Sequence, residues 1–144
     1  MAEGYKARYQ FIKAAEVYKR RMKDEAAGQA TLLEGWRSGK DSFNCLNNYF
    51  AGIRDTKQLG HEITTVYKTV VTTVNREIFL KALRYEYHKN NELAEDIKDI
   101  AYEIIATGIA TNPSIVSELK EFNISDKELL KDTIRFKANR KTYN

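Results

Sequence analysis

Apolar residues recur along most of the chain at steps of three or four, the spacing that places side chains on one face of an α-helix. The first such stripe lies within residues 5–27 and consists of Phe11, Ala15, Tyr18 and Met22. We therefore expect one helix over residues 5–27 that ends at Gly28, because glycine commonly terminates helices.

Turn residues and a second stripe define the next part of the chain. Residues 34–40, EGWRSGK, have the composition of a loop. Residues 42–53 repeat the helical spacing and predict another helix. Gly60 is expected to close this section.

Residues 64–71, TTVYKTVV, are rich in β-branched side chains, which favour strands by intrinsic propensity. The helical spacing nevertheless continues through them, from Ile63 to Val74. A strand would also need partner strands, and no second β-rich run lies nearby. We therefore expect residues 62–89 to be helical, with a break near Asn75 allowed.

The C-terminal part predicts three further helices. The clearest apolar stripe of the chain runs over residues 93–104 and is closed by Gly108. Residues 113–122 begin with proline, which is favoured in the first turn of a helix. Residues 125–128, SDKE, form a capping box that opens a last helix. The polar tail after Ala138 has no core-facing pattern.

Together these elements predict an all-α protein, a small antiparallel helical bundle with additional N- and C-terminal helices. One proline and seven glycines in 144 residues favour helices over many turns. No repeat, low-complexity tract or linker interrupts the chain, so we expect a single helical domain, 1–144. Its parts are an N-terminal helical extension (1–60), a helical core (62–108) and C-terminal helices with a basic tail (109–144).

Composition argues against a membrane-spanning or secreted chain. No run of about 18 apolar residues occurs, so we expect no transmembrane span. The first ten residues, MAEGYKARYQ, lack the apolar centre of a signal peptide. Cys45 is the single cysteine and cannot form an internal disulfide.

The charge of the chain is unevenly distributed. The net charge is +4, an acidic stretch lies at 92–103, and clusters of cations lie near the two ends. The cations near the ends are Lys6, Arg8, Lys13, Lys19, Arg20, Arg21, Lys23, Arg135, Lys137, Arg140 and Lys141. Basic ends favour an acidic partner, which is a nucleic acid, an anionic lipid surface or an acidic protein.

Motifs of common enzyme and metal sites do not occur in the sequence. Residues 61–65, HEITT, do not complete the His-Glu-x-x-His zinc pattern, and no glycine-rich phosphate loop is present. A haem held by His61 and His88 is an alternative, although His88 lies in a polar helix end. A nuclease pair of Arg84 and His88 is another, with a spacing one residue too short. We expect no catalytic residue, no metal and no directly bound cofactor.

Val66-Tyr67-Lys68 stands about one helix ahead of residues 83–104, LRYEYHKNNELAEDIKDIAYEI. This arrangement resembles the LYR-motif family of small three-helix mitochondrial proteins. In that family the first helix carries Leu-Tyr-Arg or Leu-Tyr-Lys, and the second ends in an Arg-x-x-Phe pattern with basic residues and Asn. Here Arg84 takes the arginine position and Tyr87 the phenylalanine position.

The resemblance implies a non-catalytic accessory subunit or assembly factor of a mitochondrial complex of the respiratory chain. It would dock acyl carrier protein and other subunits on the matrix side, peripheral to the inner membrane. The acyl-phosphopantetheine would belong to the carrier. The partner-binding residues that it implies are Val66, Tyr67, Lys68, Arg76, Arg84, Tyr87 and Lys89. The acyl-chain channel that it implies is lined by Val70, Phe79 and Leu83.

Two alternatives stay open. A second copy of the tripeptide, Val17-Tyr18-Lys19, offers an alternative register for the same docking. The alternative function is a basic helical structural protein of a virion or ribonucleoprotein assembly. In that case the basic ends would contact nucleic acid or neighbouring subunits.

Overall fold

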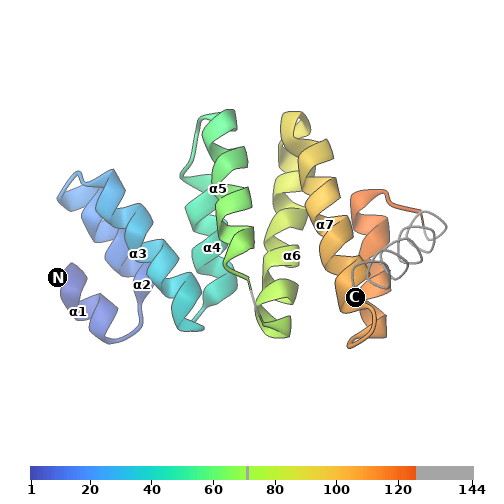
Figure 1. Ribbon diagram of the computed structural model, residues 1–144. Helices are drawn as coiled ribbons and strands as arrows, with labels where there is room; N and C mark the ends of the chain where they lie inside the picture. The colour runs from blue at the N-terminus through green and yellow to red at the C-terminus, as the bar shows by residue number, and fades with distance from the viewer. Residues whose placement is uncertain (71, 126–144) are drawn as a thin grey trace. The chain divides into compact units, whose positions relative to one another are not determined.

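The computed structural model describes residues 1–70 and 72–125, and all of their regular elements are helical (Figure 1). The all-α prediction is confirmed for these residues. They divide into two compact units, 1–82 and 83–144, and the boundary lies within one helix. The single domain expected from the sequence stays a prediction.

Unit 1 opens with short helical elements instead of one long helix, so the prediction of one helix over residues 5–27 is wrong. These elements are α1 (Ala2–Ala7), α2 (Phe11–Glu16) and the π-helical turn η1 (Val17–Arg21). Tyr9 and Lys23 interrupt the right-handed path, because their φ angles are 60° and 50°. Non-glycine residues in this left-handed region do not continue a right-handed helix.

Helix α3 (Glu25–Ser38) runs through the predicted stop at Gly28, so this prediction is wrong. It also includes residues 34–38 of the predicted loop at 34–40, so the loop prediction is wrong for these residues and only Gly39 and Lys40 follow the helix. The side chain of Asp24 caps its start by accepting a 3.0 Å hydrogen bond from the backbone N–H of Ala27. Its end is set by Gly39, which has a φ of 78°.

The two glycines inside α3 serve close packing rather than helix termination. A Cβ at Gly28 would meet Lys19 Cγ at 2.5 Å, and a Cβ at Gly35 would collide with the Cys45 side chain. Trp36, within the supposed loop, is buried at 4% exposure. Helix α3 contacts η1 beside Gly28, and α2 and α4 beside Gly35, and these neighbours explain why small residues are needed there.

Helices α4 (Ser42–Ala51) and α5 (Thr56–Lys68) follow, and the first of them confirms the helix predicted over residues 42–53. Gly60 lies inside α5, so its predicted role as a terminator is wrong. The true start of α5 is capped by Asp55, whose carboxylate accepts a 2.9 Å hydrogen bond from the backbone N–H of Gln58.

Residues 62–89 are helical except for an interruption before α6 (Thr73–Lys89). The interruption lies a few residues ahead of the break allowed near Asn75. Thr69 Oγ1 donates a 2.7 Å hydrogen bond to the Val66 carbonyl, and Thr72 Oγ1 accepts one from the Asn75 amide. Threonine hydroxyls satisfy backbone groups at helix ends in this way.

The described part of unit 2, residues 83–125, contains the last part of α6 and three further elements. These are η2 (Asn91–Leu93), α7 (Ala94–Gly108) and the 3₁₀-helix η3 (Pro113–Phe122). The helices predicted over residues 93–104 and 113–122 are confirmed, with the proline in the first turn of η3. Helix α7 packs against η3. The predicted capping box and the basic tail lie outside the described residues, apart from Ser125.

Both α7 and η3 contribute deeply buried apolar side chains to unit 2. Those with at most 1% exposure include Ile97, Ala101, Ile104, Ile105, Leu119 and Phe122. Among the described helices, none is both long and apolar enough to cross a membrane.

Candidate partner-binding site

The basic N-terminal segment of unit 1 folds into the π-helical turn η1, which carries three successive cations at 19–21. A π-helix is rare, and its backbone hydrogen bonds join residues that are five positions apart instead of four. In η1 the backbone N–H of Met22 donates a 3.2 Å hydrogen bond to the carbonyl of Val17. The turn divides its cations: Lys19 lines one recess, whereas Arg20 and Arg21 line another.

The recess that contains Arg20 and Arg21, here called the basic recess, has a volume of about 360 Å³. It is lined by Tyr5, Lys13, Glu16, Val17, Arg20 and Arg21. Its three cations are exposed, and none of them forms an ion pair within the described part of the chain. Three cations beside a single carboxylate leave a positive potential that attracts anionic groups.

The lining of the basic recess follows one helix face. Lys13, Val17 and Arg20 are separated by four and three residues along α2 and η1. The seven-residue step from Lys13 to Arg20 corresponds to roughly 10 Å along a helix. An apolar side chain therefore lies between two cations that are about two turns apart, and the half-buried Tyr5 adds an aromatic wall.

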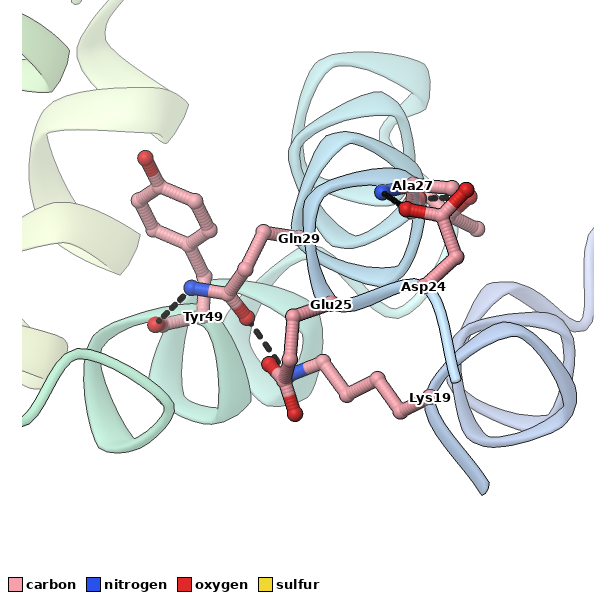
Figure 2. Close-up of polar contacts among 7 residues, drawn as sticks. Lys19, Asp24, Glu25, Ala27, Gln29 and Tyr49 are labelled. Atoms are coloured by element: carbon pink, nitrogen blue, oxygen red, sulfur yellow. Dashed lines mark hydrogen bonds and ion pairs between the residues drawn. The ribbon is translucent and has the colours of Figure 1, made fainter. Parts of the chain in front are cut away.

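The second recess, here called the polar recess, has a volume of about 720 Å³ and lies where η1, α3, the end of α4 and the start of α5 meet. Figure 2 shows the Lys19 ammonium reaching across to α3. Lys19 Nζ donates a 2.6 Å hydrogen bond to Gln29 Oε1 and lies 3.6 Å from Glu25 Oε2. Gln29 Nε2 in turn donates a 2.9 Å hydrogen bond to the carbonyl of Tyr49.

Two tyrosine hydroxyls near these recesses are held by carboxylates. Tyr18 donates a 2.7 Å hydrogen bond to Glu3, which raises the pKa of the Tyr18 phenol. Tyr49 donates a 2.8 Å hydrogen bond to Glu62, and burial together with this bond raises the pKa of Tyr49. Both phenols are therefore neutral donors at physiological pH.

Cys45 is a packing residue in unit 1. It is 1% exposed, and burial raises the pKa of its thiol to about 11. Because the thiolate is the reactive form of cysteine, this thiol is not activated as a nucleophile at neutral pH.

The tripeptide at 66–68, which the sequence favours as the docking motif, has a different environment from the tripeptide at 17–19. Val66 is buried at 4% exposure, Tyr67 is half-buried, and Lys68 is exposed at the end of α5. The Tyr67 ring stacks on Phe79, with 5.7 Å between ring centroids and an interplanar angle of 15°. Arg76 is half-buried in the first part of α6.

Phe79 lies at the centre of an aromatic cluster in unit 1 and is 0% exposed. The rings of Trp36 and Phe50 each lie 6.4 Å from its ring, in addition to Tyr67. Val70 is also buried, at 8% exposure, and Leu83, the first residue of unit 2, is 0% exposed. The residues proposed to line an acyl-chain channel are thus core residues here, and the channel itself stays a prediction.

The remaining predicted partner-binding residues belong to unit 2. Arg84 lies 3.4 Å from Glu118 and 3.9 Å from Glu121, so its guanidinium is paired with η3. The Tyr87 ring lies 5.5 Å from that of Phe122, and Lys89 is exposed. The seven residues predicted to bind the partner are therefore divided between the two units.

The alternatives based on histidine have little geometric support. His61 is exposed on α5, and His88 is exposed on α6, with its ring against that of Tyr87. Arg84 is paired with glutamates of η3. Within residues 1–70 and 72–125, no group of three or more His, Cys, Asp or Glu side chains could hold a metal ion.

Comparison with protein-family models, with curated proteins and with solved structures finds no match to this chain. The resemblance to the LYR-motif family therefore rests on residues 66–68 and 83–104 of the sequence.

Sequence reasoning identified the second tripeptide at 17–19 but missed both recesses around it. The spacing of Lys13, Val17 and Arg20 is a local signal that could have indicated the basic recess. The polar recess had no such signal, because Gln29 and Arg54 come from segments that only the fold brings to Lys19.

Proposed function

We propose that this chain is a non-catalytic docking subunit that binds an acidic protein partner through the basic recess of unit 1. The observation that supports this function is the set of exposed cations, Lys13, Arg20 and Arg21, which have no ion-pair partner among the described residues. Their charge remains available for the carboxylates of another molecule.

An amphipathic helix is the partner surface that best complements this recess. Carboxylates two turns apart on such a helix would face Lys13 and Arg20, and an apolar residue between them would cover Val17. A phosphate backbone would use the cations but would have no need of the apolar side chain. Val17 therefore favours a protein over a nucleic acid.

More specifically, the acidic partner is acyl carrier protein, and the assembly is a mitochondrial complex of the respiratory chain. This part is supported by the sequence resemblance, whose preferred register lies at 66–68 and whose alternative register, Val17-Tyr18-Lys19, contributes Val17 to the basic recess. The acyl-phosphopantetheine is carried by the partner. The role of this chain is to supply the cationic and apolar contact surface.

The test is a binding titration of the purified full-length chain with acyl carrier protein, read by calorimetry and native mass spectrometry. Reversing two charges, with Arg20→Glu and Arg21→Glu together, should weaken binding by at least about tenfold, or about 1.4 kcal/mol. Lys13→Glu, which leaves η1 unchanged, should weaken it by a smaller factor. Lys68→Glu tests the other register, and Lys57→Glu, an exposed position on α5, is the matched control.

The outcomes separate the possibilities. Loss of binding with Lys68→Glu, and none with the η1 variants, would move the docking surface to Tyr67. No binding of the carrier by the unmodified chain would refute the specific partner. Tight binding of DNA or RNA with a steep salt dependence, also lost in the η1 variants, would favour the virion or ribonucleoprotein alternative.

A further inference from the structure

The polar recess carries charges of both signs on separate segments of unit 1. Its lining includes the cations Lys19 and Arg54 and the carboxylates of Glu25 and Asp55. These four charges sum to zero, in contrast to the excess of cations in the basic recess. At about 720 Å³ its volume lies within the range of small-molecule sites.

Two glycines leave the space that the Lys19 side chain occupies. A Cβ at Gly28 would meet the lysine stem at 2.5 Å, and a Cβ at Gly52 would meet Lys19 Nζ at 2.9 Å and Gln29 Oε1 at 2.7 Å. The Lys19 side chain is only 20% exposed. The ammonium group is thus held in a defined position at one wall of the recess, next to the carboxyl end of α4.

The other three charged side chains of the polar recess differ in the hydrogen bonds and ion pairs that they already form. Asp55 is occupied as the cap of α5. Among the described residues Glu25 is paired with Lys19 alone, at 3.6 Å, and its side chain is 71% exposed. Arg54 is exposed and has no hydrogen bond or ion pair within the described part of the chain. One carboxylate and one guanidinium of the recess are therefore able to accept further partners.

We propose that the polar recess binds a small zwitterion of the amino-acid or short-peptide class. Its carboxylate binds Arg54 with support from Lys19, and its ammonium group binds Glu25. A dianion would be repelled by Glu25 and Asp55, and a dication by Lys19 and Arg54, so a ligand with both charges matches the lining best. This site is separate from the basic recess, and the inference does not depend on the proposed docking function.

The test is an NMR titration of the ¹⁵N-labelled full-length chain with glycine, diglycine and triglycine. These probes carry the same two charged ends, and the distance between the ends grows by about 3.3 Å for each added residue. We expect at least one of them to produce saturable shifts of the Gly52 and Ile53 amides. N-acetylglycine amide, which lacks both charges, should produce none.

Variants decide whether the two charges act as proposed. Arg54→Gln and Glu25→Gln should each weaken binding by about tenfold or more, and Lys57→Gln, outside the recess, should leave it unchanged. Each replaced side chain is exposed, so the fold is expected to be retained, which the NMR spectrum checks directly. Absence of saturable shifts with all three probes, equal binding of the blocked compound, or insensitivity to both substitutions would overturn the proposal.

Discussion

The tripeptide Val-Tyr-Lys occurs twice in unit 1 and has a different environment at each place. At 17–19 it forms part of a π-helical turn, with the tyrosine hydroxyl on Glu3 and the lysine drawn into the polar recess. At 66–68 it ends an α-helix, with the tyrosine ring on Phe79 and the lysine exposed. One copy thus belongs to a surface of recesses and the other to the aromatic core.

This difference teaches that a short motif does not determine the role of its side chains. In the first copy the lysine is the packed residue, because Gly28 and Gly52 leave room for it. In the second copy the valine is buried, at 4% exposure, and the half-buried tyrosine stacks its ring on Phe79. The neighbours from other helices decide which part of the tripeptide remains available to a partner.

The largest effect is expected in the aromatic core beside the second copy. Phe79→Ala removes a fully buried ring with three aromatic neighbours and should lower the free energy of unfolding by about 3–5 kcal/mol. Denaturant unfolding followed by circular dichroism measures this loss. Val74→Ala, at a position that is 65% exposed, is the control and should change stability by less than about 0.5 kcal/mol.

Replacing the tyrosine of the core copy should lower the stability more than replacing the tyrosine of the surface copy. Tyr67→Ala removes a stacked ring from the core and should cost roughly 2 kcal/mol, about half of the loss for a fully buried aromatic residue. Tyr18→Ala removes a surface hydrogen bond to Glu3 and should cost about 1 kcal/mol or less. Equal losses in the same unfolding experiment would contradict the division into a surface copy and a core copy.

For the two lysines the order should be reversed, with a larger loss of stability at Lys19 of the first copy than at Lys68 of the second. Lys19→Met leaves the Gln29 side-chain oxygen without its donor and Glu25 without its cation, and should cost about 1 kcal/mol. Lys68→Met changes an exposed side chain and should stay within about 0.5 kcal/mol of the unmodified chain. A larger loss for Lys68→Met in thermal unfolding would show that the two lysines have been assigned incorrectly.

The smallest effect concerns the titration of Tyr18. Its hydrogen bond to Glu3 raises the pKa of the phenol above the ordinary 10.0, because the neutral phenol is the donor. Glu3→Gln should therefore return the Tyr18 pKa toward 10.0 and leave the pKa of Tyr49, held by Glu62, raised. An NMR titration of the tyrosine ring carbons resolves the two residues, and an unchanged Tyr18 pKa would exclude this hydrogen bond in solution.

The sequence predicted the helices whose signals are local. The apolar stripe at 93–104 and the proline at the start of 113–122 both marked elements that the structure contains. The errors involve residues whose role depends on distant neighbours. Gly28 looked like a helix stop, yet it accommodates Lys19, and the segment 34–40 looked like a loop, yet it includes the buried Trp36.

The candidate site shows the same limit. The tripeptide at 17–19 was identified from the sequence motif, and its residues do line both recesses. Tyr5 and Arg54, which complete these recesses, lie 12 or more residues away from the tripeptide and carry no pattern of their own. Their contribution depends on the packing of α1 and α4 in unit 1, which composition and spacing do not specify.

The π-helical turn makes this part of the chain sensitive to length as well as to side-chain identity. Each residue rotates a helix by roughly 100°, so deleting one residue from η1 would turn α2 relative to α3. Arg20 could then no longer line the basic recess while the adjacent Lys19 lines the polar recess. Single-residue deletions between 17 and 21 should therefore be tolerated less well than most substitutions there.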